Sequence, residues 1–290
     1  MQGRSLTGKI WVEARWSPWF ISGAVLLGLL IAGTAFYPEL SGISAQEINV
    51  RARLLPPVFL EGGSWDHPLG TDQLGRDIFV RCLVGLRASL FVSLTATLIM
   101  FVFGCAVGLW SGYKGGTVDL VLMRLTDVQL SIPAIILAIA VLGVSRPTMP
   151  LIIIVLALAS WPIYARVSRS IALNERNREY VRAARVLGAN DLRIVLLLIA
   201  ANVVPPLAFV AVLDVARLMI FEAMLSFLGL GIQPPTPSFG TMIADGRTYM
   251  INAWWIASMP GVFLFLVLLS LNLLGTAFER ARERVYGRTG

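Results

Sequence analysis

The sequence predicts an all-α integral membrane protein with six transmembrane helices. Hydrophobic residues make up 57% of the 290 residues and charged residues only 14%, and the mean hydropathy is +0.75, far from the composition of a water-soluble domain. The apolar residues also fall into separate long runs, which is typical of helices that cross a bilayer. We therefore expect the bilayer to be the solvent for most of this chain.

Six apolar runs are near or above the roughly 20 residues that a helix needs to cross the hydrocarbon core. They cover residues 19–37, 88–110, 120–144, 151–171, 194–221 and 256–278. The first run is longer than the apolar part of a cleavable signal and is followed by no clean cleavage site, so we expect it to remain as an anchor. The chain then divides into a cytoplasmic N-terminus with the first helix (1–37), an extracytoplasmic loop (38–87), a five-helix transmembrane domain (88–278) and a cytoplasmic tail (279–290).

The loops differ in their content of lysine and arginine, which is higher on the cytoplasmic side of membrane proteins. If the N-terminus is inside, the inner segments carry roughly twice as many of these residues as the outer ones. Both termini and the polar stretch 177–191 are therefore predicted to face the cytoplasm. The net charge of +7 is explained by topology and anionic lipid, and no nucleic-acid partner is expected.

The polar stretch NREYVRAARVLGAND, residues 177–191, interrupts the apolar runs and has the spacing of a short helix. The predicted apolar face contains Tyr180, Val181, Ala184 and Leu187. The predicted opposite face contains Arg178, Arg182 and Arg185. Gly188 is placed to end the helix in the left-handed conformation, and Asn190 or Asp191 to cap the next one. From spacing alone, the helix either lies on anionic lipid or docks on another protein.

This stretch resembles the EAA loop in membrane subunits of bacterial ABC importers, and most closely the C-type subunits of the dipeptide, oligopeptide and nickel permease family. In that family the segment, here about 175–190, forms a coupling helix that sits in a groove of a separate ATPase subunit. The resemblance assigns this contact to Glu179, Tyr180, Arg182, Ala183, Ala184 and Gly188. Arg182 stands where the family's motif often has Glu, and Glu179 is nearby.

Further motifs resemble the same family, in the same order, from about residue 68 to residue 275. They are HPLGTDQLGRDIFVR (67–81), GYKGG (112–116) and EAMLSFLGLGIQPPTPSFG (222–240). The resemblance implies a permease subunit in the bacterial cytoplasmic (inner) membrane that imports di- or oligopeptides by alternating access. Nickel chelates, glutathione-like peptides and small glycosides are alternative substrates. The implied partners are a second homologous permease, two cytoplasmic ATPases, an extracytoplasmic binding protein and membrane lipid.

We expect no enzymatic activity and no cofactor on this chain, with ATP and Mg bound by the partner subunits. The segment GRSLTGKI (3–10) fits GxxxxGK, but Ile10 occupies the position of the Mg²⁺-binding Ser or Thr and no strand precedes it. One histidine and scattered acidic residues do not supply a clustered catalytic or metal site. A secondary transporter or channel is the alternative from another class, but the sequence has no convincing internal repeat.

Charged residues inside the spans need a partner or a function because their burial in lipid is costly. Asp214 and Arg217 are one turn apart on the fifth span and are expected to pair, as are Arg124 and Asp127 on the third. The candidates for a substrate path or gate are Glu222, Asp214, Arg217 and Asn202. Glu222, where the fifth span meets the outer loop, is the better candidate for a gate or for contact with a delivery protein.

Gly104 and Gly108 form a GxxxG pattern in the second span. Such a pattern lets two helices approach closely, although it also occurs by chance. A helix contact face and a chance occurrence are both compatible with the sequence.

Overall fold

The structure is a computed structural model that describes residues 6–287, in which the regular secondary structure is helical and no strand is formed. The lysine and arginine residues predicted on the cytoplasmic side include Arg4 and Arg288, and both lie outside the described residues. The same is true of the first residues of the segment 3–10. The helices are α1 (Leu6–Arg15), α2 (Pro18–Ser41), α3 (Ile78–Lys114), α4 (Gly116–Ser131), α5 (Ala134–Val144), α6 (Met149–Glu175), α7 (Glu179–Val186), α8 (Asp191–Arg193), α9 (Ala200–Phe227), α10 (Phe239–Gly246) and α11 (Trp255–Gly287). A π-helical turn, Ile194–Ile199, joins α8 to α9, and the 3₁₀ turns Val50–Ala52 and Arg247–Tyr249 lie in loops.

Five helical segments of the described chain are long and apolar enough to cross a membrane, and a bent pair of helices makes a sixth crossing if it is counted as one span. This agrees with the predicted all-α architecture. The predicted third span, 120–144, corresponds to this bent pair, in which α4 and α5 meet at an angle of 80°. Pro133 causes the break, because the residue before a proline is driven out of the helical region, and Ile132 has φ −96° and ψ 119°.

The helix α3 begins at Ile78, well before the predicted start of the second span at residue 88. Asp77 fixes this start, because its Oδ1 accepts a hydrogen bond of 2.8 Å from the backbone N–H of Val80. The first turns of α3 include the buried Arg81, and a search for apolar runs does not count such a residue as part of a span.

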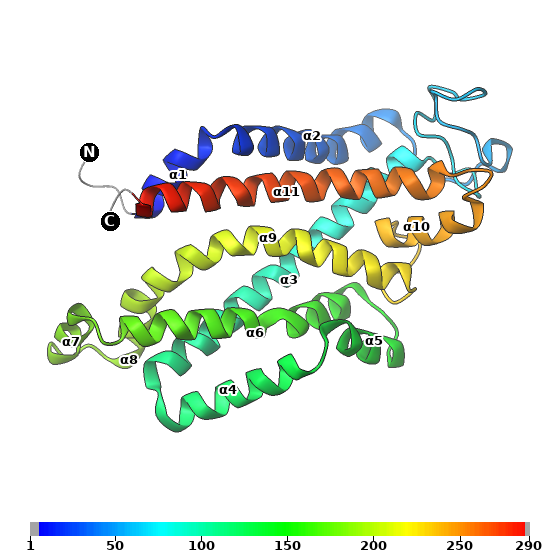
Figure 1. The fold of residues 1–290 in the computed structure, drawn as a ribbon. Helices are drawn as coiled ribbons and strands as arrows, with labels where there is room; N and C mark the ends of the chain where they lie inside the picture. The colour runs from blue at the N-terminus through cyan, green and yellow to red at the C-terminus, as the bar shows by residue number, and fades with distance from the viewer. Residues whose placement is uncertain (1–5, 288–290) are drawn as a thin grey trace.

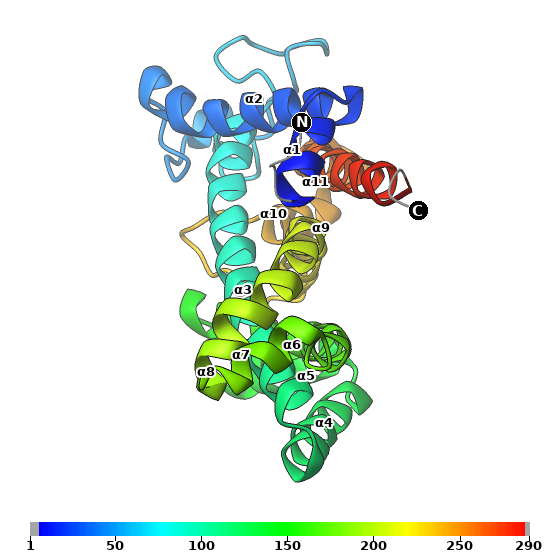
Figure 2. The ribbon, with the colours of Figure 1, turned by 90° about the vertical axis from the view of Figure 1, so that its left-hand side faces the viewer.

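The long helices form a layer of α2, α11, α9, α6 and α4, and α3 crosses it on one side (Figure 1). Figure 2, viewed from the end that carries α7, shows α3 beside α6, α9 and α11. We call this end the α7 end and the opposite one, which carries α10 and the loop 42–77, the α10 end. The start of α1 and the end of α11 both lie at the α7 end (Figure 1), as the predicted topology requires of segments that share one side of the membrane.

The most extensive helix contact in the described part of the chain is between α3 and α6, and glycine makes it possible. A Cβ atom on Gly104 would lie 2.6 Å from the carbonyl oxygen of Trp161, and one on Gly108 would lie 2.2 Å from that of Ala165. Gly112, one turn further on, meets Arg169 in the same way at 2.7 Å. The GxxxG pattern is therefore a true contact face, because no larger side chain fits between the two backbones.

At the α10 end, the motif of residues 67–81 builds a compact turn before α3. The Oδ1 of Asp72 accepts hydrogen bonds from the backbone N–H groups of Leu74 at 2.8 Å and Arg76 at 3.0 Å. The Nδ1 of His67 lies 2.8 Å from the Oδ2 of Asp77. Gly75 has φ +75°, and a Cβ there would meet the carbonyl oxygen of Asn49 at 1.8 Å. The residues of this motif thus hold the loop in shape.

Candidate functional site

The helix α7 forms where the polar stretch predicted it. Val181 is completely buried, and Ala184 packs against the same hydrophobic core. Gly188 has φ +82°, its N–H donates to the carbonyl of Arg185, and the N–H of Ala189 donates to that of Ala184, both at 3.0 Å. These two bonds form a Schellman motif, so the predicted role of Gly188 in ending the helix is confirmed.

The predicted apolar face of α7 was only partly right. Val181 and Ala184 face the protein, but Leu187 is 86% exposed and the neighbouring Val186 is 88% exposed. Positions three and four residues after Val181 share its face of the helix, whereas Val186 and Leu187 do not. The surface that α7 presents outward includes Glu179, Arg182, Ala183, Val186 and Leu187.

Polar contacts fasten the segment around α7 to the end of α3. The carboxylate of Asp191 accepts hydrogen bonds from the hydroxyl of Tyr113 at 2.6 Å and the ammonium of Lys114 at 2.5 Å. Arg185 lies over the Tyr113 ring, with its Cζ 5.7 Å from the ring centroid. Asn190 caps the next helix, accepting from the N–H of Arg193 at 2.8 Å. These contacts connect the segment around α7 to α3 and to the helix that leads into α9.

A second connection joins α7 to α6 and α9. The Tyr180 hydroxyl donates a hydrogen bond to the Oε2 of Glu175 at the end of α6. The Nδ2 of Asn202 on α9 donates to the Tyr180 hydroxyl at 3.0 Å and to Glu175 Oε2 at 3.1 Å. Burial, followed by the hydrogen bond to Glu175, raises the pKa of Tyr180, so the phenol stays protonated and keeps donating. The structure thus places Asn202 beside α7 and not with Asp214.

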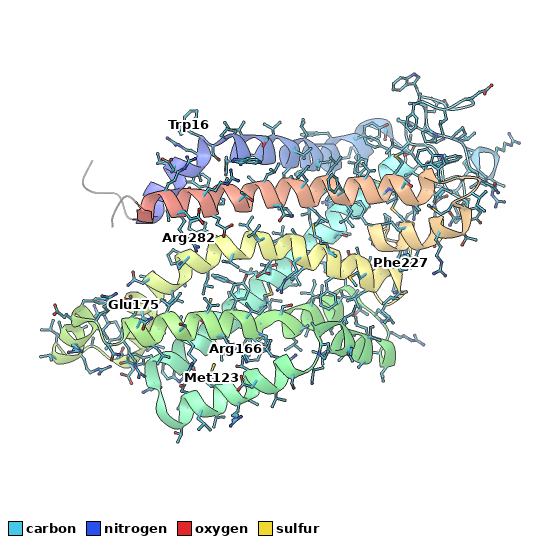
Figure 3. The ribbon with its side chains drawn as sticks, viewed as in Figure 1. Trp16, Met123, Arg166, Glu175, Phe227 and Arg282 are labelled. Atoms are coloured by element: carbon cyan, nitrogen blue, oxygen red, sulfur yellow. The ribbon has the colours of Figure 1, made fainter. Side chains whose placement is uncertain are left out.

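Two ion pairs of the long helices involve the charged residues that were predicted to pair. The Nε of Arg217 is 2.9 Å from the Oδ1 of Asp214, which confirms the predicted pair, and the Tyr164 hydroxyl on α6 donates to the other oxygen of Asp214 at 2.5 Å. The predicted pair of Arg124 and Asp127 does not form. Asp127 instead accepts from the Nη2 of Arg166 on α6 at 2.7 Å (Figure 3 labels Arg166), a partner that local spacing on one helix cannot reveal.

Both ion pairs are partly exposed. The exposed fraction of the side chain is 46% for Arg217, 53% for Arg166 and 50% for Asp127. We do not expect charged groups with this exposure to face hydrocarbon, because a charged side chain that loses its water there pays a high free-energy cost. They therefore mark a surface of the helices that faces water or another polypeptide.

Glu222 is completely buried at the α10 end of α9. Its carboxylate accepts hydrogen bonds from the hydroxyl of Ser89 on α3 at 2.8 Å and that of Ser226 at 2.5 Å. Ser226 in turn accepts from the N–H of Ile232 in the following loop at 3.0 Å. Glu222 therefore has no exposed surface in this structure and links α3, α9 and the loop. Its predicted role as a gate or as a contact of a delivery protein stays a prediction.

Comparison with known proteins identifies the family. The family described as "Binding-protein-dependent transport system inner membrane component" matches residues 104–284. The chain belongs to this family. It is therefore a multi-pass inner membrane protein and a permease component of a binding-protein-dependent ABC importer.

Relatives of similar length are peptide permeases. The chain is 36% identical to the di/tripeptide transport system permease protein DppC of Pseudomonas aeruginosa, over 91% of this chain and 87% of that protein. It is 34% identical to the dipeptide transport system permease protein DppC of Haemophilus influenzae, over 95% and 93%. With the probable D,D-dipeptide transport system permease protein DdpC of Escherichia coli, the identity is 36% over 89% and 85%.

A solved structure has the same fold. A chain of the MetNI methionine ABC transporter in an inward-facing conformation superposes with a TM-score of 0.56 and 20% identity, over 71% of this chain and 96% of that chain. At this level of identity the likeness concerns the fold alone. It confirms the importer permease architecture that the sequence motifs predicted.

Proposed function

We propose that the chain is the permease subunit of a peptide importer and that α7 transmits the ATPase cycle to its helices. The observation that carries the coupling role is the position of α7: its inner face is locked to α3, α6 and α9, while Val186 and Leu187 project from the protein. Apolar side chains this exposed at the end of a protein suit a partner surface. The peptide permeases among the relatives support peptides as substrate.

The proposed assembly contains this chain, a second homologous permease, two cytoplasmic ATPases that hold ATP and Mg, and an extracytoplasmic binding protein. The α7 end faces the cytoplasm in this proposal, because the excess of lysine and arginine lies in the segments at that end. The residues proposed to contact the ATPase are Glu179, Arg182, Ala183, Val186 and Leu187, whereas Tyr180, Ala184 and Gly188 hold the helix in place.

The substrate path is proposed to run along the surface that carries the two ion pairs, Asp214–Arg217 and Arg166–Asp127. These four groups present both signs of charge on α4, α6 and α9. A peptide has a positive amino end and a negative carboxyl end, so a surface with paired charges can replace part of its hydration without favouring one net charge. In this proposal Glu222 acts indirectly, by holding α9 against α3.

The proposal is tested by purifying the tagged chain with its partners and reconstituting it into liposomes. The double substitution V186D/L187D should remove the co-purifying ATPases while keeping the second permease, because two carboxylates replace the exposed apolar contacts. I251D is the matched control for the ATPases, since Ile251 is 96% exposed at the α10 end, away from α7, and its substitution should keep the ATPases and the second permease.

The liposomes then test the substrate. Wild-type assemblies should take up a labelled dipeptide with ATP and binding protein, and V186D/L187D assemblies should not. If the double variant keeps its ATPases and its uptake, α7 is not the coupling element. If the wild type takes up a nickel chelate or a glycoside but no peptide, the substrate assignment is wrong and the coupling assignment stands.

A further inference from the structure

A pocket of about 250 Å³ opens at the α10 end, between the turn before α3, the loop after α9 and the helix α10. Phe227, labelled in Figure 3 at the α10 end of α9, forms part of its wall. Its polar lining residues are Arg76, Arg81, Ser226, Gln233, Thr236, Thr241 and Asp245. Neither α7 nor the ion pairs Asp214–Arg217 and Arg166–Asp127 contribute a residue to its lining.

The two arginines share a single carboxylate partner. The Nε of Arg76 donates to the Oδ2 of Asp72 at 2.6 Å, and the Nε of Arg81 lies 3.6 Å from the same oxygen. The other oxygen of Asp72 already accepts two backbone N–H groups. One carboxylate therefore balances two guanidinium groups, and these three residues together leave one positive charge.

Arg81 is the less well satisfied of the two. Its residue is only 5% exposed, yet beyond the 3.6 Å approach to Asp72 its guanidinium has one long hydrogen bond, from Nη1 to the carbonyl oxygen of Ala45 at 3.4 Å. An adjoining cavity of about 10 Å³ beside Gln73 has room for at most one water. A buried guanidinium with five donors and so few acceptors is a strong site for an anion.

Asp245 sets the charge of the ligand. It is exposed at the edge of the pocket, and in the described part of the chain no basic group lies within 4 Å of its carboxylate. Its negative charge repels an anion bound by the two arginines, and this repulsion is about twice as large for a doubly charged anion as for a singly charged one. The pocket therefore favours a singly charged anion. A carboxylate matches the fork of an arginine by accepting two N–H groups at once.

We propose that this pocket binds a single carboxylate group. The inference rests on the proposed function, in which this end receives substrate, and the carboxylate then has two possible sources. One is the carboxyl terminus of the peptide, and the other is an Asp or Glu side chain of the external binding protein. In both cases Arg76 and Arg81 supply the donors, and Asp245 weakens the binding by repulsion.

The first measurement uses acetate as the probe and the full-length chain in detergent. Acetate, compared with chloride at equal ionic strength, should raise the melting temperature of the wild type and raise it further in D245N. It should have no such effect in R76Q, while R51Q, which changes an exposed arginine of the same loop region outside the pocket, should respond like the wild type. Equal responses to acetate in R76Q and the wild type would overturn the carboxylate site.

The second measurement identifies the source, using the assembled transporter in nanodiscs. If the peptide supplies the carboxylate, alanyl-alanine binds about tenfold more tightly than its C-terminal amide, and R76Q removes this difference. If the binding protein supplies it, R76Q weakens docking of the loaded binding protein by about tenfold and D245N strengthens it. The opposite signs of R76Q and D245N distinguish an electrostatic site from general damage, so weaker binding in both variants would contradict the proposal.

Failure of the proposed function gives a different result from failure of the carboxylate site. If the proposed function is wrong, the wild-type assembly takes up no peptide, and the acetate response of the purified chain still tests the carboxylate site on its own. Conversely, a wild type that imports peptide while R76Q and D245N change neither binding measurement shows that the importer assignment is right and the carboxylate site is wrong.

Discussion

Glu222 shows how the surroundings of a single residue decide its role. A carboxylate at the end of a span looks like a contact for a partner when only its position in the sequence is known. The structure buries it between the hydroxyls of Ser89 and Ser226. A group that is completely covered acts on function through the elements that it holds together, in this case α3, α9 and the loop after α9.

Replacing Glu222 by Ala is expected to destabilise the protein by about 1–3 kcal/mol, because the two hydroxyls lose their shared acceptor in a buried site. The measurement is the melting temperature of the purified chain in detergent. E222Q should fall between E222A and the wild type, since the amide oxygen still accepts one of the bonds. Docking of the binding protein should be unchanged in E222Q, and a loss of docking at unchanged melting temperature would show that Glu222 does contact the partner.

The charged residues of the spans show what local spacing can and cannot predict. Asp214 and Arg217 pair as their separation of one turn suggests, since both side chains leave the same face of one helix. Arg124 and Asp127 have the same separation, yet Asp127 bonds to Arg166 on α6. The competing partner comes from a helix packed alongside, and its position depends on the tertiary fold.

At the scale of elements, the contact of α3 with α6 depends on the absence of side chains at Gly104, Gly108 and Gly112. The spacing of four residues places these glycines on one face of α3. Without a hydrophobic driving force between helices in lipid, close packing of this kind supplies much of the association. The sequence contained this signal, and the structure decides between a contact face and a chance pattern.

Gly108→Leu is expected to separate α3 from α6, because even a Cβ atom would lie 2.0 Å from the Oγ of Ser168. Overpacking of this kind costs about 1–3 kcal/mol or more. The matched control is Gly28→Leu on α2, where no heavy atom lies within 4 Å of the added Cβ. Expression and melting temperature of the two variants in detergent give the comparison, and equal values for both would argue against the tight contact.

The bend between α4 and α5 was not foreseen, although its cause is visible in the sequence. The apolar run continues through Pro133, and a criterion based on hydrophobicity alone counts it as one span. The proline breaks the helix by restricting Ile132. A proline frees backbone groups of the helix from their hydrogen bonds. Whether it bends a span or ends it depends on whether neighbouring helices can satisfy these groups, which is a property of the folded chain.

At the scale of the whole molecule, sequence reasoning recovered the class of fold, most helices and the position of α7. These features depend on hydrophobic runs, a glycine at the end of a helix and motifs in order along the chain. It missed the exposed Val186 and Leu187, the Arg166–Asp127 pair and the link from Tyr180 to Asn202. Each of these depends on which helices meet in space, and a single sequence without its fold does not contain that information explicitly.

The link between Tyr180, Glu175 and Asn202 gives a prediction about the mechanism of the whole transporter. It joins α7 to both α6 and α9, so it carries movement of α7 into the two helices that hold Asp214 and Tyr164. Y180F removes the hydroxyl but keeps the ring. The loss of hydrogen bonds worth about 1 kcal/mol is expected to lower the number of peptides imported per ATP hydrolysed by about fivefold.

The measurement is the ratio of peptide uptake to ATP hydrolysis in proteoliposomes, with co-purification of the ATPases as a check on docking. Tyr37→Phe is the control, because Tyr37 packs its ring on Phe79 near the end of α2, and this end of α2 lies far from α7 (Figure 1). If Y180F keeps both the ATPases and the wild-type ratio, α7 moves the helices through Asp191 and Tyr113 alone. If Y180F loses the ATPases, the hydroxyl serves to position α7 for docking, and the link does not transmit its movement.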